Sequence, residues 1–111
     1  MKFTSNLFAS LRLAKTGEGY EVFDVPIDNL TFSVTRLHSK THTKGHSHNE
    51  TDELYIVLSG RGTILLDENE DKLYPGDFIV IPRGVFHRSY NNGKDDLIFA
   101  CIFAKYKGRG K

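Results

Sequence analysis

Short apolar runs separated by turn-forming residues make up most of the chain from Tyr20 onward. Runs of this length, rich in Val, Ile, Phe and Tyr and bounded by Gly, Pro, Asn and Asp, are typical of β-strands. Helical periodicity is scarce, so the pattern predicts an all-β protein. We predict strands at Tyr20–Val25, Leu30–Leu37, Leu54–Ser59, Thr63–Asp67, Asp77–Ile81, His87–Tyr90 and Leu97–Ala104, with a further strand near Lys44–Asn49.

The residues between these strands indicate where the chain reverses. The polar run Glu68–Asp71 is expected to form the turn of a hairpin. Pro75 and Gly76 suit the centre of a type II turn, because Pro fixes φ at the first position and Gly accepts positive φ at the second. The N-terminal stretch Ser5–Lys15 fits either a short amphipathic helix or an edge strand, and we favour the strand.

Composition narrows the class of protein. A chain of 111 residues, 39% of them hydrophobic, is long enough for one core, so we expect residues 1–111 to form a single domain. The net charge of +1 gives no field that would attract nucleic acid. The single cysteine, Cys101, excludes an internal disulfide and is expected to be a buried, inert thiol. With no signal peptide and no membrane span evident, we expect a cytoplasmic protein.

The histidines point to a metal site. On a β-strand, residues i and i+2 share a face, so His46 and His48 would present two imidazoles side by side as a chelating pair. Imidazole binds Zn, Fe, Ni, Mn and Cu, and an added carboxylate favours harder six-coordinate ions. Glu50 lies two residues after His48 and would share its face of the strand, so alternation along a strand favours Glu50 as the carboxylate ligand. Glu53 would point to the opposite face unless the chain turns between His48 and Glu53. The polar residues at 49–52 are of the kind that interrupts a strand, so alternation along a strand does not decide between Glu50 and Glu53.

The chain resembles the cupin superfamily in two motifs. The first, G-x5-H-x-H-x3,4-E-x6-G, is matched by His46, His48, Glu53 and Gly60. The second, G-x5-P-x-G-x2-H-x3-N, is matched in full by Gly76, Pro82, Gly84, His87 and Asn91. The leading glycine of the first motif is the one departure, because Lys40 occupies its position and a glycine stands at Gly45 instead.

The resemblance implies a fold and a set of metal ligands. It implies a double-stranded β-helix, the jelly-roll barrel of cupins, holding one divalent transition metal ion such as Fe, Mn, Zn or Ni. The ligands carried over from the family motifs are His46, His48, Glu53 and His87. Tyr55 is expected either in the barrel core or on the cavity wall. His42 could approach the cavity, but a solvated side chain is favoured for it, and Arg36 and Tyr90 are weaker candidates for the cavity wall.

Three functions remain open at the level of sequence. Four protein ligands on an octahedral ion leave two adjacent positions, which suit a small oxygen-rich metabolite. The stretch 43–62 is similar to cupin-type phosphoglucose and mannose-6-phosphate isomerases, which favours a metal-dependent sugar or sugar-phosphate isomerase. The alternatives are a mononuclear iron dioxygenase and a non-enzymatic module that binds a metal or small ligand. Phe3–Leu13 is apolar and has no obvious partner in the core motifs, so we predict a homodimer that uses residues 1–15 in its interface.

Overall fold

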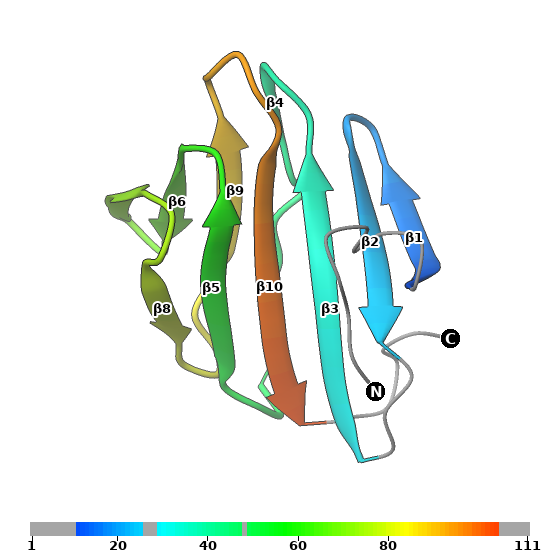
Figure 1. The fold of residues 1–111 in the computed structure, drawn as a ribbon. Helices are drawn as coiled ribbons and strands as arrows, with labels where there is room; N and C mark the ends of the chain where they lie inside the picture. The colour runs from blue at the N-terminus through cyan, green and yellow to red at the C-terminus, as the bar shows by residue number, and fades with distance from the viewer. Residues whose placement is uncertain (1–10, 26–28, 48, 105–111) are drawn as a thin grey trace.

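The structure, a computed structural model, describes residues 11–25, 29–47 and 49–104. Every regular element in these ranges is a β-strand, which confirms the all-β prediction (Figure 1). The strands are β1 (Arg12–Gly17), β2 (Tyr20–Val25), β3 (Leu30–Leu37), β4 (Thr41–His42), β5 (Glu53–Ser59), β6 (Gly62–Leu66), β7 (Asn69–Leu73), β8 (Phe78–Ile81), β9 (His87–Asn91) and β10 (Leu97–Ala104). This part of the chain contains no helix that is long and apolar enough to cross a membrane.

The strands form two antiparallel sheets. One sheet has six strands in the order β1-β2-β3-β10-β5-β8, and the other has four in the order β4-β9-β6-β7. Figure 1 shows the larger sheet in front, with β9, β6 and β4 behind it. Neighbours within a sheet come from distant parts of the chain, since β10 pairs with both β3 and β5. This arrangement is the jelly-roll barrel expected from the sequence.

Alternation along the central strands puts the core between the two sheets. In β5, Glu53, Tyr55 and Val57 are buried, while the intervening residues face outward or are half-buried. Strand β10 likewise buries every second residue, Leu97, Phe99, Cys101 and Phe103, and Ala100 between them is buried as well. Side chains on one face of a strand are two residues apart, so both strands direct one row of side chains into the barrel. Glu53 is therefore an acidic side chain in an otherwise apolar row.

The predicted strand at Lys44–Asn49 was wrong. The structure has the two-residue strand β4 at Thr41–His42, and His46 forms only an isolated bridge to His87. Gly45 has φ of 84°, a left-handed conformation that interrupts an extended strand. The expected i, i+2 pairing of the two motif histidines involves His48, which lies outside the described residues.

The hairpin between β6 and β7 turns earlier than predicted. Its two-residue turn is formed by Asp67 and Glu68, so Asn69 and the two residues that follow it, assigned to the turn from sequence, belong to β7. Asp67 has φ of 53° and is fixed by Phe86, whose backbone N–H donates to its carboxylate at 3.0 Å. Its own N–H donates to the Phe86 carbonyl at 2.8 Å. A contact between distant parts of the chain therefore selects the turn.

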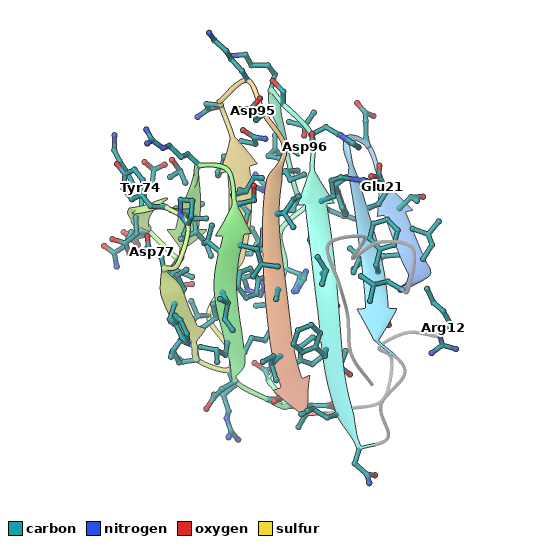
Figure 2. The ribbon with its side chains drawn as sticks, in the orientation of Figure 1. Arg12, Glu21, Tyr74, Asp77, Asp95 and Asp96 are labelled. Atoms are coloured by element: carbon teal, nitrogen blue, oxygen red, sulfur yellow. The ribbon has the colours of Figure 1, made fainter. Side chains whose placement is uncertain are left out.

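Two other local predictions are confirmed. Gly76 has φ of 90°, and the N–H of Asp77 donates to the carbonyl of Tyr74 at 3.0 Å, as a turn centred on residues 75 and 76 requires. Figure 2 shows Tyr74 and Asp77 close together at this turn. The preference for an edge strand over a helix is confirmed for Arg12–Lys15, which lies in β1, whereas residues 5–10 lie outside the described residues.

Candidate metal centre

Three of the four motif ligands are brought together by separate segments. Glu53 is the first residue of β5, His87 is the first residue of β9, and His46 lies in the segment after β4. Two backbone hydrogen bonds join the histidines: His46 N donates to His87 O at 3.0 Å, and His87 N donates to His46 O at 2.9 Å. The three side chains offer ligand atoms that all lie within 4.8 Å of one another.

The spacing of these atoms suits a shared ion. Oxygen Oε2 of Glu53 lies 3.6 Å from Nε2 of His87 and 3.9 Å from Nε2 of His46. The two imidazole rings meet edge to face with centroids 4.3 Å apart. Donor atoms bonded to one ion at about 2.0–2.2 Å are roughly 3–4 Å from each other. The two nitrogen–oxygen separations therefore match those of donors that share one ion, and imidazole and carboxylate are suitable donors for a divalent transition metal.

The ring of His87 is oriented by a contact outside the cluster. Its Nδ1 lies 3.4 Å from the carbonyl oxygen of Val85, which can only accept a hydrogen bond. When Nδ1 carries the hydrogen and donates it to this carbonyl, the lone pair of Nε2 is on the side of Glu53. Metal-binding histidines usually donate their second ring nitrogen to a carbonyl or carboxylate in this way.

Glu53 is oriented by a residue that sequence reasoning did not place at the site. The thiol of Cys101 on β10 donates to Oε1 of Glu53 with 2.8 Å between sulfur and oxygen, and both residues are buried. The expected burial of Cys101 is confirmed, but its thiol contacts the carboxylate. Cys101 shares a face of β10 with residues 97, 99 and 103. Alternation along the strand could therefore have predicted from the sequence that its side chain points into the barrel.

The other candidates lie apart from the cluster. Glu50 is exposed, and the cluster contains Glu53 instead. His42 is also exposed, with Nδ1 2.8 Å from the Thr43 carbonyl and its ring 5.5 Å from that of Tyr90. Arg36 donates to Glu21 at 3.2 Å. His42, Tyr90 and Arg36 were predicted as candidates for the cavity, and none of them is among the described residues that line the cavity beside the cluster.

A cavity of about 310 Å³ opens beside the cluster. His46 and His87 lie on its wall, and Tyr55 serves both expected roles, since it lines the cavity and packs in the core. The side chain of His46 is 50% exposed, whereas that of Glu53 is only 3% exposed. The cluster is therefore buried on the Glu53 side and accessible on the His46 side, where a small molecule can reach it.

Fold and site together define a barrel protein with a histidine and carboxylate cluster at its cavity, the class that the sequence motifs indicate. The chain belongs to the cupin family, because the sequence profile of the cupin domain matches residues 33–103. It is 31% identical to a glucose-6-phosphate isomerase of Pyrococcus abyssi and 33% identical to one of Pyrococcus horikoshii. Each alignment covers 76% of this chain and 53% of the relative, so the chain spans about half the length of these curated relatives.

Solved structures show the same fold. KdgF from a Halomonas species superposes with a TM-score of 0.77 at 18% identity, covering 96% of each chain. A predicted oxalate decarboxylase from Thermotoga maritima superposes with a TM-score of 0.80, also at 18% identity, covering 96% of this chain and all of the other. Likeness at this level of sequence identity shows the fold alone, so function is argued from the site.

Proposed function

We propose that this cupin is a metal-dependent enzyme acting on a small oxygen-rich metabolite, with a sugar or sugar-phosphate isomerisation as its reaction. The observation that carries the proposal is the cluster of His46, Glu53 and His87 on an accessible cavity. The glucose-6-phosphate isomerases among its relatives support the choice of reaction.

The proposed ligands of one divalent transition metal ion, Fe, Mn, Zn or Ni, are His46, Glu53 and His87 together with His48 of the same motif. A divalent ion bound there supplies a Lewis acid that polarises a substrate carbonyl oxygen. The protein contributes the orientation of the donors: Val85 fixes the His87 ring, and Cys101 holds the Glu53 carboxylate. The open side at His46 admits the substrate, and the apolar wall formed by Tyr55 and Phe99 limits water around it.

The first experiment identifies the metal and then the reaction. Elemental analysis of the full chain purified without chelators is expected to give close to one divalent transition metal ion per chain. With that metal, glucose 6-phosphate is then tested for conversion to its ketose, and oxygen uptake is measured in parallel with phenols and keto acids. Isomerisation supports the proposal. Oxygen uptake without isomerisation favours the iron dioxygenase, and ligand binding without turnover favours a binding module.

Variants connect the metal to the site. His87→Ala and His46→Ala are expected to lose most of the bound metal while circular dichroism still shows the β-fold. The matched control is His42→Ala, because His42 is an exposed histidine outside the cluster and its replacement is expected to leave the metal content unchanged. Full metal occupancy in both cluster variants would show that the site is assigned to the wrong residues.

A further inference from the structure

The cavity beside the cluster has a cationic lining. Its ionisable side chains include Lys15, Lys44 and the two cluster histidines, His46 and His87. Among the described residues that line it, none is an Asp or Glu. A cleft lined by charges of one sign, with low-dielectric walls, concentrates ligands of the opposite sign.

A β-bulge places Lys15 on this wall. The pairing of β1 with β2 shifts between Leu13 and Lys15, so that Lys15, and not Ala14, lies opposite Val22. Residues directly opposite in an antiparallel pair share a face, and Val22 is buried and lines the cavity. Without the extra residue, Ala14 would occupy this position and Lys15 would lie opposite Glu21. Bulges often redirect a side chain beside a functional site.

Lys44 reaches the cavity from a different segment, two residues before His46. The carbonyl of Lys44 accepts hydrogen bonds from Nε and Nη2 of Arg88 at 3.1 and 2.7 Å, which fix this part of the backbone. Lys44 also lines an adjoining hollow of about 530 Å³ together with Lys40 and His42, and Glu18 is the one acidic residue among the described residues that line it. Basic side chains therefore outnumber acidic ones among the described residues that line both the cavity and this adjoining hollow.

We propose that the cavity binds a small anionic metabolite, with Lys15 and Lys44 holding its phosphoryl or carboxylate group while its other oxygens face the histidine and carboxylate cluster. This inference rests on the proposed function, for which it specifies the charge of the substrate. Lysine binds such groups as a mobile point charge and needs no fixed geometry, which suits two long side chains at a cavity rim.

The test is calorimetric titration of the full chain, loaded with the metal that elemental analysis identifies. The probes are glucose 6-phosphate, gluconate and glucose, which differ in carrying a phosphoryl group, a carboxylate or no charge. At least one of the two anions is expected to bind, and to bind more tightly than glucose. The comparison of the two anions decides which anionic group the lysines select.

Lys15→Gln and Lys44→Gln are each expected to weaken binding of that anion about 3- to 10-fold, and the double variant more strongly. The matched control is Lys72→Gln, since Lys72 is exposed on β7 and does not line the cavity. Unchanged anion affinity in the double variant, equal binding of glucose and the anions, or no binding of any probe overturns the inference. Metal content is measured in every variant, so loss of the metal site is detected separately from loss of the anion site.

Discussion

The thiol of Cys101 and the carboxylate of Glu53 are joined by a buried hydrogen bond, with 2.8 Å between Sγ and Oε1. The second oxygen of the same carboxylate, Oε2, faces the imidazoles of His46 and His87. One oxygen of Glu53 is therefore fixed by β10 while the other remains directed at the histidines. This division of roles makes Cys101 a positioning residue for the proposed metal site.

Cys101→Ala is expected to lower metal affinity by about tenfold, because loss of a partner that orients a ligand costs about 10- to 100-fold. Cys101→Ser replaces the thiol with a hydroxyl, which is also a hydrogen-bond donor. Its metal affinity is therefore expected to stay closer to that of the unchanged protein. Metal affinity is measured by competition with a chromogenic chelator, and the free energy of unfolding of the metal-free protein by denaturant titration.

The metal affinities of the alanine and serine variants distinguish a positioning role of Cys101 from a role in core packing. If packing alone matters, both variants lower the free energy of unfolding and neither changes metal affinity. If the hydrogen bond matters, the alanine variant binds metal more weakly than the serine variant. Equal metal affinity in all three proteins contradicts a positioning role for Cys101.

The carboxylate ligand is tested by two conservative variants. Glu53→Gln keeps the shape of the side chain but replaces a charged donor with an amide, so it is expected to reduce metal affinity strongly. Glu50→Gln is the matched control, because Glu50 is exposed and lies outside the cluster. Elemental analysis of both variants after the same purification checks the assignment. If Glu50→Gln loses the metal and Glu53→Gln keeps it, the ligand is the residue that shares the strand face of His48, and not the one that the family motif indicates.

Much of the fold could be predicted because its signals are local. Alternating apolar residues and the turn at Pro75 and Gly76 predicted the strands around them, and no bound of the seven strands predicted besides Lys44–Asn49 differs by more than one residue. The predictions that were wrong depend on contacts between distant segments. The predicted strand at Lys44–Asn49 is interrupted at Gly45, where a side chain would meet Phe86 and Arg88, and the β6–β7 turn is selected by Phe86. The partnership of Glu53 with Cys101 arises in the same way, since it joins residues 48 positions apart.

Lys40 shows why the cupin motif has a glycine at its position. Its φ of 64° lies in the left-handed region, where a side chain costs about 1 kcal/mol. Lys40→Gly is therefore expected to raise the free energy of unfolding by about 0.5 kcal/mol, after the greater freedom of glycine in the unfolded chain is counted. Lys40→Ala is the control, because both variants lose the 3.0 Å contact of Nζ with the Asn92 carbonyl. A glycine variant no more stable than the alanine variant contradicts this explanation.

A histidine between two carboxylates predicts a pH dependence of stability. Nε2 of His38 lies 2.8 Å from Oε2 of Glu21, and Nδ1 lies 3.2 Å from Oδ1 of Asp96. Figure 2 shows Glu21 and Asp96 at the same end of the larger sheet. The hydrogen bond to Glu21 raises the pKa of His38 above 6.5, against a smaller opposing effect of burial. Burial raises the pKa of Glu21, but hydrogen bonds from His38 and Arg36 outweigh it and lower this pKa below 4.5.

The raised pKa of His38 means that its stabilising effect is fully present below pH 6.5 and is lost as pH rises through the raised value. The lowered pKa of Glu21 means that its effect is present above pH 4.5 and is lost as pH falls through the lowered value. The stability difference between the unchanged protein and His38→Gln is therefore expected to be largest between about pH 4.5 and 6.5. The His38 side chain is 42% exposed, so we expect no more than about 1 kcal/mol.

Urea unfolding of both proteins across pH 4 to 9 measures this difference. His42→Gln is the matched control, because the His42 ring contacts the Thr43 carbonyl and not a carboxylate. A difference for His38→Gln that stays constant over the whole range contradicts the charged contact.

The predicted homodimer is tested through β1. In the structure β1 is the edge of the larger sheet and pairs with β2 of its own chain, while Leu13 on it is 57% exposed. An edge strand with an exposed apolar side chain favours pairing with a second copy, so light scattering of the full chain is expected to give the mass of a dimer. A chain that begins at Gly17 is expected to be monomeric.

The opposite edge provides the competing explanation and its control. Phe78 and Val80 on β8 are 67% and 64% exposed, so a dimer could form there instead. Phe78→Lys is expected to leave the dimer intact if residues 1–15 form the interface, because it adds a charge only at the far edge of the sheet. A dimer that survives removal of residues 1–16 but dissociates in Phe78→Lys would assign the interface to β8. A monomeric mass for the full chain would contradict both interfaces, and β1 would then serve only as the outer strand of its own barrel.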